Sequence, residues 1–427
     1  MSIWKKVRLS DISTSMYGYT ASASTEAVGP KFLRITDIQD RVINWDSVPY
    51  CAISEKEYEK YKLYKNDIVV ARTGNSTGTN AIIKEDIDAV FASYLIRFRV
   101  NEKIADPYFV ASVLSSKSFT EFVNQVAGGS AQKGANANIL GTFEVSLPPL
   151  GVQQRIASII RLFDDKIELN RRMNETLEQM AMALYKHWFV DFGPFQDGES
   201  DIPQGWEYSP IEKLISEIES GDWGADKWTE KTPHQVICIR GTDIPQVRTG
   251  NDVKAPLRFI KQKSFEKKIL KPGDIVLEAS GGSPSQSTGR PVLITKGIIS
   301  RFNVPLTCSN FCKIIRPSSK NFSYYLYLHF MDSYEQNVFF SYENGTTGIK
   351  NLDINSYIKQ NYIAIPPINI IDEFNQAVED LFEQIQRNAI ETDYLKETRD
   401  YLLSRLLSGE IEVREAEEQV EEVLANA

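Results

Sequence analysis

The chain repeats itself once over its whole length, and this duplication constrains the fold more than any other feature of the sequence. Five short patterns occur twice in the same order. They are a tryptophan entry (Trp4, Trp206), an R-x-T-D-I segment (34–38, 240–244), a turn followed by a strand-like run (64–74, 271–281), a serine-led apolar run (93–98, 309–314) and a proline pair (146–150, 364–368). The offset between copies grows from 202 to 218 residues, as loop insertions would produce. Ordered matches of this kind predict one structural unit present twice.

Each copy divides at its proline pair. The part before it mixes short strand-like runs with Gly, Ser and Asn loops, which is typical of a globular domain. A proline pair suits the start of a helix, and the pattern beyond it is helical. We therefore expect an α+β fold with two pseudo-repeated globular domains separated by two long antiparallel coiled-coil helices. The expected boundaries are 1–149 and 200–367 for the globular domains, 150–192 and 368–409 for the helices, and 410–427 for an acidic tail without assigned function.

The apolar residues after each proline pair follow a heptad repeat. Their spacing alternates between four and three residues, through Ile156, Ile160, Phe163, Ile167, Leu177, Ala181, Leu184 and Trp188 in the first copy and Phe374, Val378, Leu381, Ile385, Leu395, Leu402 and Leu406 in the second. Asn170 and Asn388 fill equivalent slots, where a polar side chain typically fixes register at a cost in stability. Arg399 interrupts the second seam and indicates a frayed or partner-facing turn. We expect the two helices to pair over roughly 50 Å; the alternative is that each packs only on its own globular domain.

The net charge of −9 does not exclude a nucleic-acid partner, because a phosphate responds to local charge rather than to the sum. Residues 410–427 alone contribute −6 of that charge. No run of eighteen apolar residues and no long apolar segment at the start is present, so we expect neither a membrane span nor a secretory signal. The scattered cysteines, Cys51, Cys238, Cys308 and Cys312, are expected to be buried reduced thiols of a cytoplasmic protein rather than metal ligands.

The sequence also lacks the patterns of common catalytic sites. Its three histidines, His187, His234 and His329, stand near no Ser/Asp or Cys/Asn constellation that would form a triad. The glycine-rich segment 74–81 lacks the Lys-Ser/Thr of a phosphate-binding loop. No clustered carboxylates indicate a two-metal nuclease, and we expect no metal site. We therefore expect a chain that is not an enzyme.

The repeated plan of globular unit, proline pair and long helix resembles the specificity subunit of type I restriction–modification enzymes across essentially the whole chain. The segments that carry the resemblance are 4–12, 64–74 with its copy 271–281, and above all 147–181, where a glutamine pair follows the proline pair. The second copy, 365–395, departs from this pattern because Ile-Asp-Glu-Phe replaces Gln-Gln-Arg-Ile. That departure puts the partner contacts of the second helix in doubt.

The resemblance implies a non-catalytic DNA-recognition subunit that reads a bipartite site in double-stranded DNA, one half with each globular domain. It also implies two methyltransferase (modification) subunits as partners, with motor-nuclease (restriction) subunits as further ones. No cofactor is expected in this chain, whereas S-adenosylmethionine, ATP and Mg²⁺ would act in the partner subunits. Two alternatives stay open: a stand-alone DNA-binding regulator, and a partner-binding scaffold or DNA mimic with the same fold.

Loops are expected to supply the DNA contacts, because strands and helices are occupied in cores. Arginine, lysine, asparagine and glutamine suit phosphates and base edges, and Trp223 would stack on a displaced base or fill a surface groove. The candidates in the first unit are Tyr19, Thr20, Arg72, Thr73, Asn75, Ser76, Thr77, Asn80, Gln132, Lys133, Asn136 and Asn138. Those in the second are Trp223, Lys227, Ser283, Gln286, Ser287, Arg290, Thr346, Thr347, Lys350 and Asn351. Because the loops differ between the copies, the two half-sites should differ as well.

Overall fold

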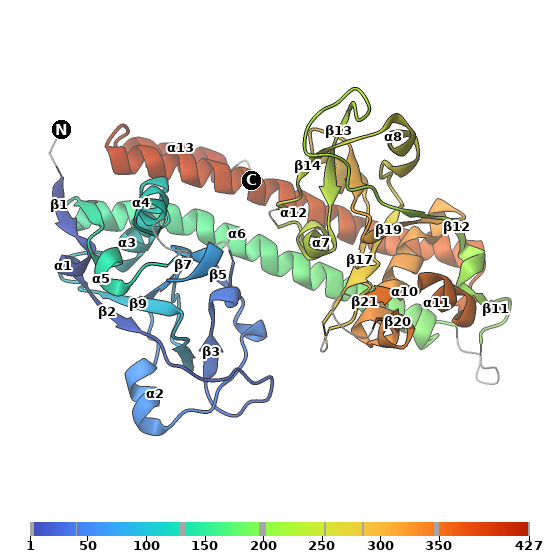
Figure 1. The fold of residues 1–427 in the computed structure, drawn as a ribbon, viewed down its shortest axis with the longest axis horizontal. Helices are drawn as coiled ribbons and strands as arrows, with labels where there is room; N and C mark the ends of the chain where they lie inside the picture. Colours follow the sequence, from blue (N-terminus) through green and yellow to red (C-terminus); the bar gives the residue numbers. More distant parts are fainter. Residues whose placement is uncertain are drawn as a thin grey trace. The chain divides into compact units, whose positions relative to one another are not determined.

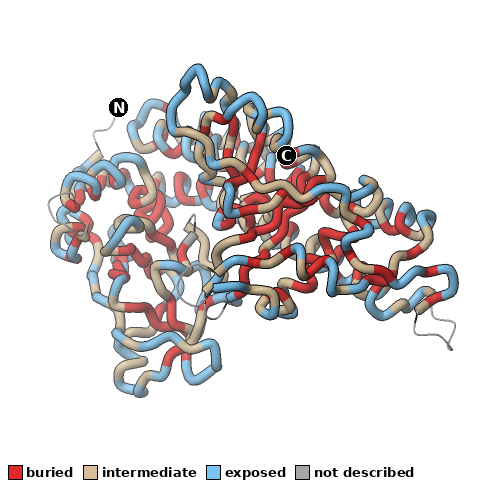
Figure 2. The backbone as a smooth tube through the Cα atoms, turned by 45° about the vertical axis from the view of Figure 1, so that its right-hand side comes forward, coloured by how far each residue is buried: buried red, intermediate tan, exposed pale blue. Residues whose placement is uncertain are grey.

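The computed structural model describes residues 4–39, 41–127, 134–195, 202–251, 253–283, 286–345 and 350–425. The chain divides into two compact units (Figure 1), unit 1 formed by Met1–Glu168 with Leu395–Ala427, and unit 2 formed by Leu169–Tyr394. Each unit therefore combines a globular part with one stretch of each long helix. Buried residues lie along the interior segments of the chain, and exposed residues lie along its outer turns (Figure 2).

The globular part of unit 1 carries a four-stranded sheet and three two-stranded ladders. Its strands are β1 (Lys5–Arg8), β2 (Ser13–Tyr17), β3 (Lys31–Leu33), β4 (Ile38–Gln39), β5 (Val42–Ile43), β6 (Ile68–Ala71), β7 (Asn80–Ile82), β8 (Ala89–Phe91), β9 (Leu95–Val100) and β10 (Glu144–Leu147). Its helices are α1 (Leu9–Ile12), η1 (Ile35–Asp37), η2 (Trp45–Ser47), α2 (Glu55–Tyr61), η3 (Gly74–Ser76), α3 (Pro107–Leu114), α4 (Lys117–Ala127) and α5 (Ala137–Gly141).

The globular part of unit 2 repeats this plan with additions. Its strands are β11 (Glu207–Pro210), β12 (Ile215–Ser220), β13 (His234–Ile239), β14 (Leu257–Ile260), β15 (Ile275–Glu278), β16 (Ser280–Gly281), β17 (Pro291–Leu293), β18 (Leu306–Cys308), β19 (Cys312–Pro317), β20 (Glu343–Asn344), β21 (Lys350–Leu352) and β22 (Tyr362–Ile365). Its helices are η5 (Ile211–Leu214), η6 (Gly241–Asp243), α7 (Ile244–Thr249), α8 (Gln262–Lys268), α9 (Lys296–Ser300), η7 (Lys320–Phe322), α10 (Ser323–Glu335), η8 (Val338–Tyr342) and α11 (Ile354–Gln360).

The duplication read from the sequence is confirmed in the sheet topology. The order β2-β9-β6-β7 in unit 1 recurs as β12-β19-β15-β17 in unit 2. The parallel ladder β3·β8 recurs as β13·β18, and the closing ladder β1·β10 recurs as β11·β22. The predicted α+β class with two related globular parts is therefore correct.

The repeated sequence patterns mark repeated backbone geometry. Asn66 in unit 1 and Gly273 in unit 2 occupy equivalent turns, with left-handed φ angles of 73° and 97°. Gly and Asn adopt this conformation most readily. The aspartate that follows each accepts a backbone N–H three residues upstream, Tyr64 to Asp67 and Lys271 to Asp274, both at 2.9 Å. The turn residues thus explain why these motifs recur.

The two long helices are α6 (Leu150–Tyr185), which continues as the π-turn Lys186–Val190, and α12 (Ile368–Ser408). They lie side by side (Figure 1), and the predicted seam is their contact. In unit 1 the seam buries Ile156, Ile160, Phe163 and Leu402, and in unit 2 Ala181, Phe374, Val378 and Ile385. The contact pairs show that the helices run antiparallel, because Asp164 meets Arg399 while Asn174 meets Asn388.

Asn170 and Asn388 belong to a buried polar cluster at the seam of unit 2. Asn388 donates to Oδ1 of Asn174 at 2.8 Å, and Asn170 donates to Thr392 Oγ1 at 3.4 Å and to Glu391 Oε2 at 2.9 Å. The 218-residue offset relates Asn170 to Asn388 and Asn174 to Thr392, so the two pairs are equivalent to each other. Two hydrogen-bonded pairs of this kind favour one register of the helices over its neighbours.

Two expectations for the helices differ from the structure. Arg399 is neither frayed nor exposed: it is 7% exposed and pairs with Asp164 and Asp400, which satisfies its charge inside the seam. The acidic tail 410–427, interpreted from the sequence as frayed helix or disorder, contains helix α13 (Val413–Ala425), which belongs to unit 1. This helix forms because Val413, Ala416 and Val420 recur at helical spacing and pack in the core of unit 1, where Ile411, just before the helix, is also buried.

Candidate nucleic-acid interface

Three loops that are distant in the sequence of unit 1 meet at Tyr17. The guanidinium of Arg72 lies over the Tyr17 ring, 4.9 Å from its centroid. The Tyr17 hydroxyl accepts the backbone N–H of Ala137 at 2.9 Å. The backbone N–H of Ala135 in turn donates to the Arg72 carbonyl at 2.9 Å, next to a bridge between Thr73 and Gly134. The strand end at 17, the loop after β6 and the loop before α5 therefore form one surface.

Most of the candidates of unit 1 lie on these loops with exposed or half-exposed side chains. Thr20, Asn75, Asn136 and Asn138 are exposed, whereas Tyr19, Arg72, Thr73, Ser76 and Thr77 are half-buried. Asn136 also caps α5, because its side chain accepts the N–H of Ile139 at 2.9 Å. Gln132 and Lys133 lie outside the described residues.

Asn80 differs from the other candidates of this loop because its side chain is buried and fully paired. Its Nδ2 donates to the carbonyl of Leu114 at 2.6 Å, and its Oδ1 accepts the hydroxyl of Ser115 at 2.8 Å. Only 5% of the residue is exposed. Contrary to the prediction from the sequence, Asn80 is therefore not positioned to contact an adenine edge. Its side chain instead fixes the end of the loop to α3.

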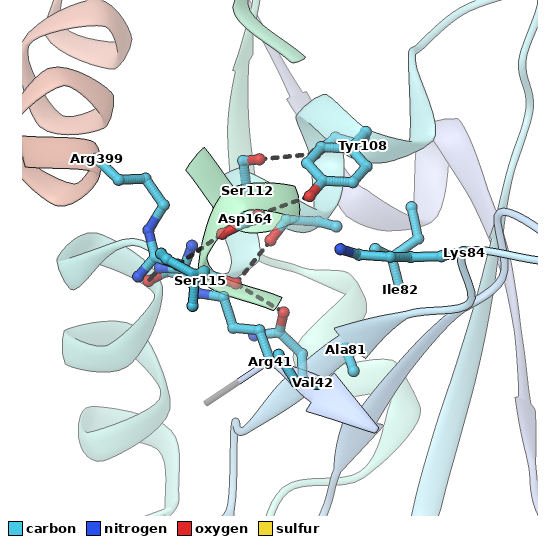
Figure 3. Close-up of a pocket in the computed structure, with 13 residues that line it drawn as sticks. Arg41, Val42, Ala81, Ile82, Lys84, Tyr108, Ser112, Ser115, Asp164 and Arg399 are labelled. Atoms are coloured by element: carbon cyan, nitrogen blue, oxygen red, sulfur yellow. Dashed lines mark hydrogen bonds and ion pairs between the residues drawn. The ribbon is translucent and has the colours of Figure 1, made fainter. Parts of the chain in front are cut away.

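A cluster of charged side chains of unit 1 lines a small cavity that Asn80 also lines (Figure 3). Arg41 donates to the Ser115 carbonyl at 3.1 Å, and Arg399 pairs with Asp164 at 2.6 Å. Tyr108 donates its hydroxyl to the same aspartate at 2.6 Å. Burial and the neighbouring Arg399 lower the pKa of Arg41. The residues line a cavity of about 30 Å³, which has room for little more than one water molecule, so the cluster supports the loop and is not a ligand pocket.

In unit 2 the corresponding loops form a small sheet in the order β16-β21-β20. The hydroxyl of Ser280 donates to Asn351 at 2.6 Å, and the Thr288 N–H donates to Glu343 at 2.6 Å. Lys350 pairs with the same glutamate at 2.7 Å. The loop after β15 and the loop before α11 are therefore joined, as their counterparts are in unit 1.

The candidates of unit 2 divide by exposure. Trp223, Lys227, Gln286 and Asn351 are exposed, and Ser283 and Lys350 are half-buried. Arg290 is half-buried, and its guanidinium forms a two-pronged contact with the buried Glu278. Ser287 is 2% exposed and belongs to the interior of the loop. Thr346 and Thr347 lie outside the described residues.

Trp223 borders an open groove on unit 2 with a volume of about 430 Å³. The guanidinium of Arg258 lies 4.2 Å from the centre of the indole, and its Nε donates to the Trp223 carbonyl at 2.9 Å. Lys261 and Asn310 line the same groove. The sequence did not single out these three residues, because they come from β14 and two separate loops that only the fold brings together.

The remaining expectations concern metals, thiols and membranes. Cys51, Cys238, Cys308 and Cys312 are all buried and free, and burial raises the pKa of Cys238 and of Cys312 to about 12. Within the described ranges, no group of three or more His, Cys, Asp or Glu side chains is arranged to hold a metal ion. No helix in that part of the chain is long and apolar enough to cross a membrane.

Comparison with known proteins gives one consistent family. Residues 1–179 match the family described as the type I restriction modification DNA specificity domain. The chain is 30% identical over 321 residues to the type I restriction enzyme MjaIX specificity subunit of Methanocaldococcus jannaschii, covering 71% of this chain and 68% of that protein. It is 25% identical to the HindI specificity subunit of Haemophilus influenzae, over 96% of this chain and 100% of that one.

A solved structure has the same fold. The type I restriction-modification system S subunit from M. genitalium superposes with a TM-score of 0.50, covering 94% of this chain and 96% of that one. The two sequences are 14% identical, so this likeness concerns the fold alone.

Proposed function

Because this chain belongs to the specificity subunits of type I restriction enzymes, we propose that each of its units reads one half of a bipartite DNA site. The chain is the DNA-recognition subunit of such a complex. The main support for a DNA-binding surface on unit 1 is that three segments meet there, through the contacts of Tyr17 with Arg72 and with Ala137. Loops held in this way present polar groups in fixed positions, which direct readout of base edges requires.

The candidates for contact are the exposed and half-exposed polar residues of these loops. In unit 1, Arg72 would donate to phosphate or guanine, and Asn75, Asn136 and Asn138 would face base edges. In unit 2, Gln286 and Asn351 take that role. Phosphates next to the Trp223 groove would be contacted by lysines on or beside α8, namely Lys261, Lys263 and Lys267. This segment has a net positive charge, because Glu266 is the one acidic residue of α8.

The chain itself carries out no reaction in this proposal. Two methyltransferase subunits dock on it, and motor-nuclease subunits join them for cleavage. S-adenosylmethionine, ATP and Mg²⁺ act in those partners. The duplication supports this arrangement. Each unit contains a stretch of both long helices, so the two units offer similar docking sites to two identical partners.

The test is co-expression with the modification subunit, followed by single-molecule mapping of methylated bases in total DNA. We expect methylated adenines in both halves of a split motif. The double variant Arg72→Ala/Asn75→Ala should relax or abolish recognition of one half, and Gln286→Ala/Asn351→Ala should do so for the other. Lys6→Ala is the control, because its side chain on β1 is 71% exposed and pairs with Glu144 of β10, which belongs to none of the three loops. Unmethylated DNA despite a stable complex would contradict the proposal.

A further inference from the structure

Asn174 holds three parts of unit 2 with one buried amide. Its Oδ1 accepts Nδ2 of Asn388 across the seam at 2.8 Å. Its Nδ2 donates to the carbonyl of Ile385 on α12 at 3.3 Å and to the carbonyl of Thr249 at 3.0 Å. Thr249 is the last residue of α7 and belongs to the globular part. A residue that is 3% exposed thus joins both long helices to the domain that carries the candidate loops.

The globular part of unit 2 packs closely on α12 at two glycines. A Cβ on Gly250 would lie 2.5 Å from the Cβ of Ala389, and one on Gly297 would lie 2.4 Å from the Cβ of Gln386. Two segments of the globular part, just after α7 and in the first turn of α9, therefore touch α12 through glycine. Distances below 3.0 Å would force the backbones apart.

An ion pair between a buried arginine and a partly exposed aspartate completes the contact. Arg301 is 4% exposed at its side chain and pairs with Asp393 of α12 at 3.1 Å. The same Nη2 donates to the carbonyls of Gly250 at 3.1 Å and Asn251 at 3.3 Å. The end of α7 is therefore held on one side by Asn174 of α6 and on the other by Arg301.

An apolar side chain at position 174 would pack in the seam but would not fix the domain, because dispersion contacts have no direction. A hydrogen bond to one chosen carbonyl disappears when the partners slide by one residue, and the buried amide then remains unsatisfied. We propose that Asn174 is a positioning residue, which fixes the recognition domain of unit 2 on the helix pair and so restricts the spacer length that the chain accepts between half-sites. This inference rests on the proposed function.

The equivalent position in the other copy is Thr392, which accepts from Asn170 within the seam. Unit 1 is held to its helices by contacts of its own, among them the buried Gln153 of α6, which accepts the backbone N–H of Asp106 at 2.9 Å, and the ion pair of Lys84 with Asp165 at 2.9 Å. Loss of the amide at 174 should therefore loosen the placement of the globular part of unit 2 and leave that of unit 1 unchanged.

The experiment uses the full modification complex and a plasmid library with the wild-type bipartite site at spacers one and two base pairs shorter and longer. For Asn174→Ala we expect methylation of the wrong spacers, relative to the right one, to rise about five- to tenfold, as the loss of a directed buried hydrogen bond would give. The preferred bases in both halves should stay the same.

Asn388→Ala is the matched control, because it removes the bond between the two asparagine side chains across the seam but leaves the bonds of Asn174 to Thr249 and Ile385. It should keep the wild-type spacer preference. An Asn174→Ala complex with unchanged spacer preference would overturn the inference, and so would an Asn388→Ala complex with an equally broad one. If Asn174→Ala does not assemble, Gly297→Ala is measured in its place, since the added methyl displaces the same domain from α12. Failure of the wild-type complex to methylate any bipartite site would contradict the proposed function instead.

Discussion

Arg399 of α12 donates to Asp164 of α6 at 2.6 Å inside unit 1, at a seam position where the heptad pattern calls for an apolar residue. The side chains are 8% and 15% exposed. Asp164 also accepts the hydroxyl of Tyr108, so one carboxylate joins both helices to α3. A buried pair of this kind is costly to break, because the remaining charge has no compensation.

Removal of Arg399 should therefore destabilise unit 1 strongly. We expect Arg399→Met to lower the free energy of unfolding by about 3 to 5 kcal/mol. The double variant Arg399→Met/Asp164→Leu should lose much less, because it leaves no unpaired charge. A double-mutant cycle measured by urea unfolding tests this, and additive losses would contradict the coupling.

Stability should fall in mild acid because of His329. This residue is buried between the hydroxyls of Tyr185 and Tyr357, at 2.9 and 3.1 Å, and burial lowers its pKa from 6.5 to about 4, against a smaller opposing effect of Asp332. Between these values the unfolded chain binds the proton and the folded chain does not. The contribution of the neutral His329 to the free energy of unfolding is therefore fully present above pH 6.5. It is lost progressively towards pH 4, by as much as about 3 kcal/mol.

The variant His329→Gln isolates that effect, since an amide can keep hydrogen bonds to the tyrosines without titrating near this pH. We expect its loss of stability between pH 7 and pH 5 to be clearly smaller than that of the wild type, as measured by urea midpoints at both pH values. Equal losses would show that other groups carry the acid sensitivity.

Helix α13 should contribute to the stability of unit 1. Truncation after Gly409 removes Ile411, Ala416 and Val420 from the core, and we expect a loss of about 3 kcal/mol from apolar burial. Arg155→Gln, which removes only the solvent-exposed pair with Glu417, is the matched control and should cost less than about 1 kcal/mol. Thermal unfolding of the three proteins distinguishes packing from charge; a truncated chain as stable as the wild type would contradict the prediction.

Arg72 should contribute to DNA affinity through charge as well as geometry. Arg72→Ala should weaken binding of the complex by about 1 to 3 kcal/mol if the side chain reads guanine. If it contacts phosphate, the slope of log affinity against log salt should fall by about 0.9. Arg72→Lys separates the two roles, because lysine keeps the charge but loses the two-pronged donor. Unchanged affinity in Arg72→Ala would remove this residue from the interface.

The sequence by itself determined the duplication, the α+β class and the pairing of the long helices. These depend on local signals: a heptad period, a proline pair, and the Asn66 and Gly273 turns that need a left-handed residue. Only the tertiary structure decided that Asn80 faces inward, that Arg399 finds Asp164, and that the Tyr17 hydroxyl holds the loop before α5. Such contacts join residues far apart in the chain and often end on a backbone carbonyl or N–H, which every residue type offers, so no pattern of side chains announces them.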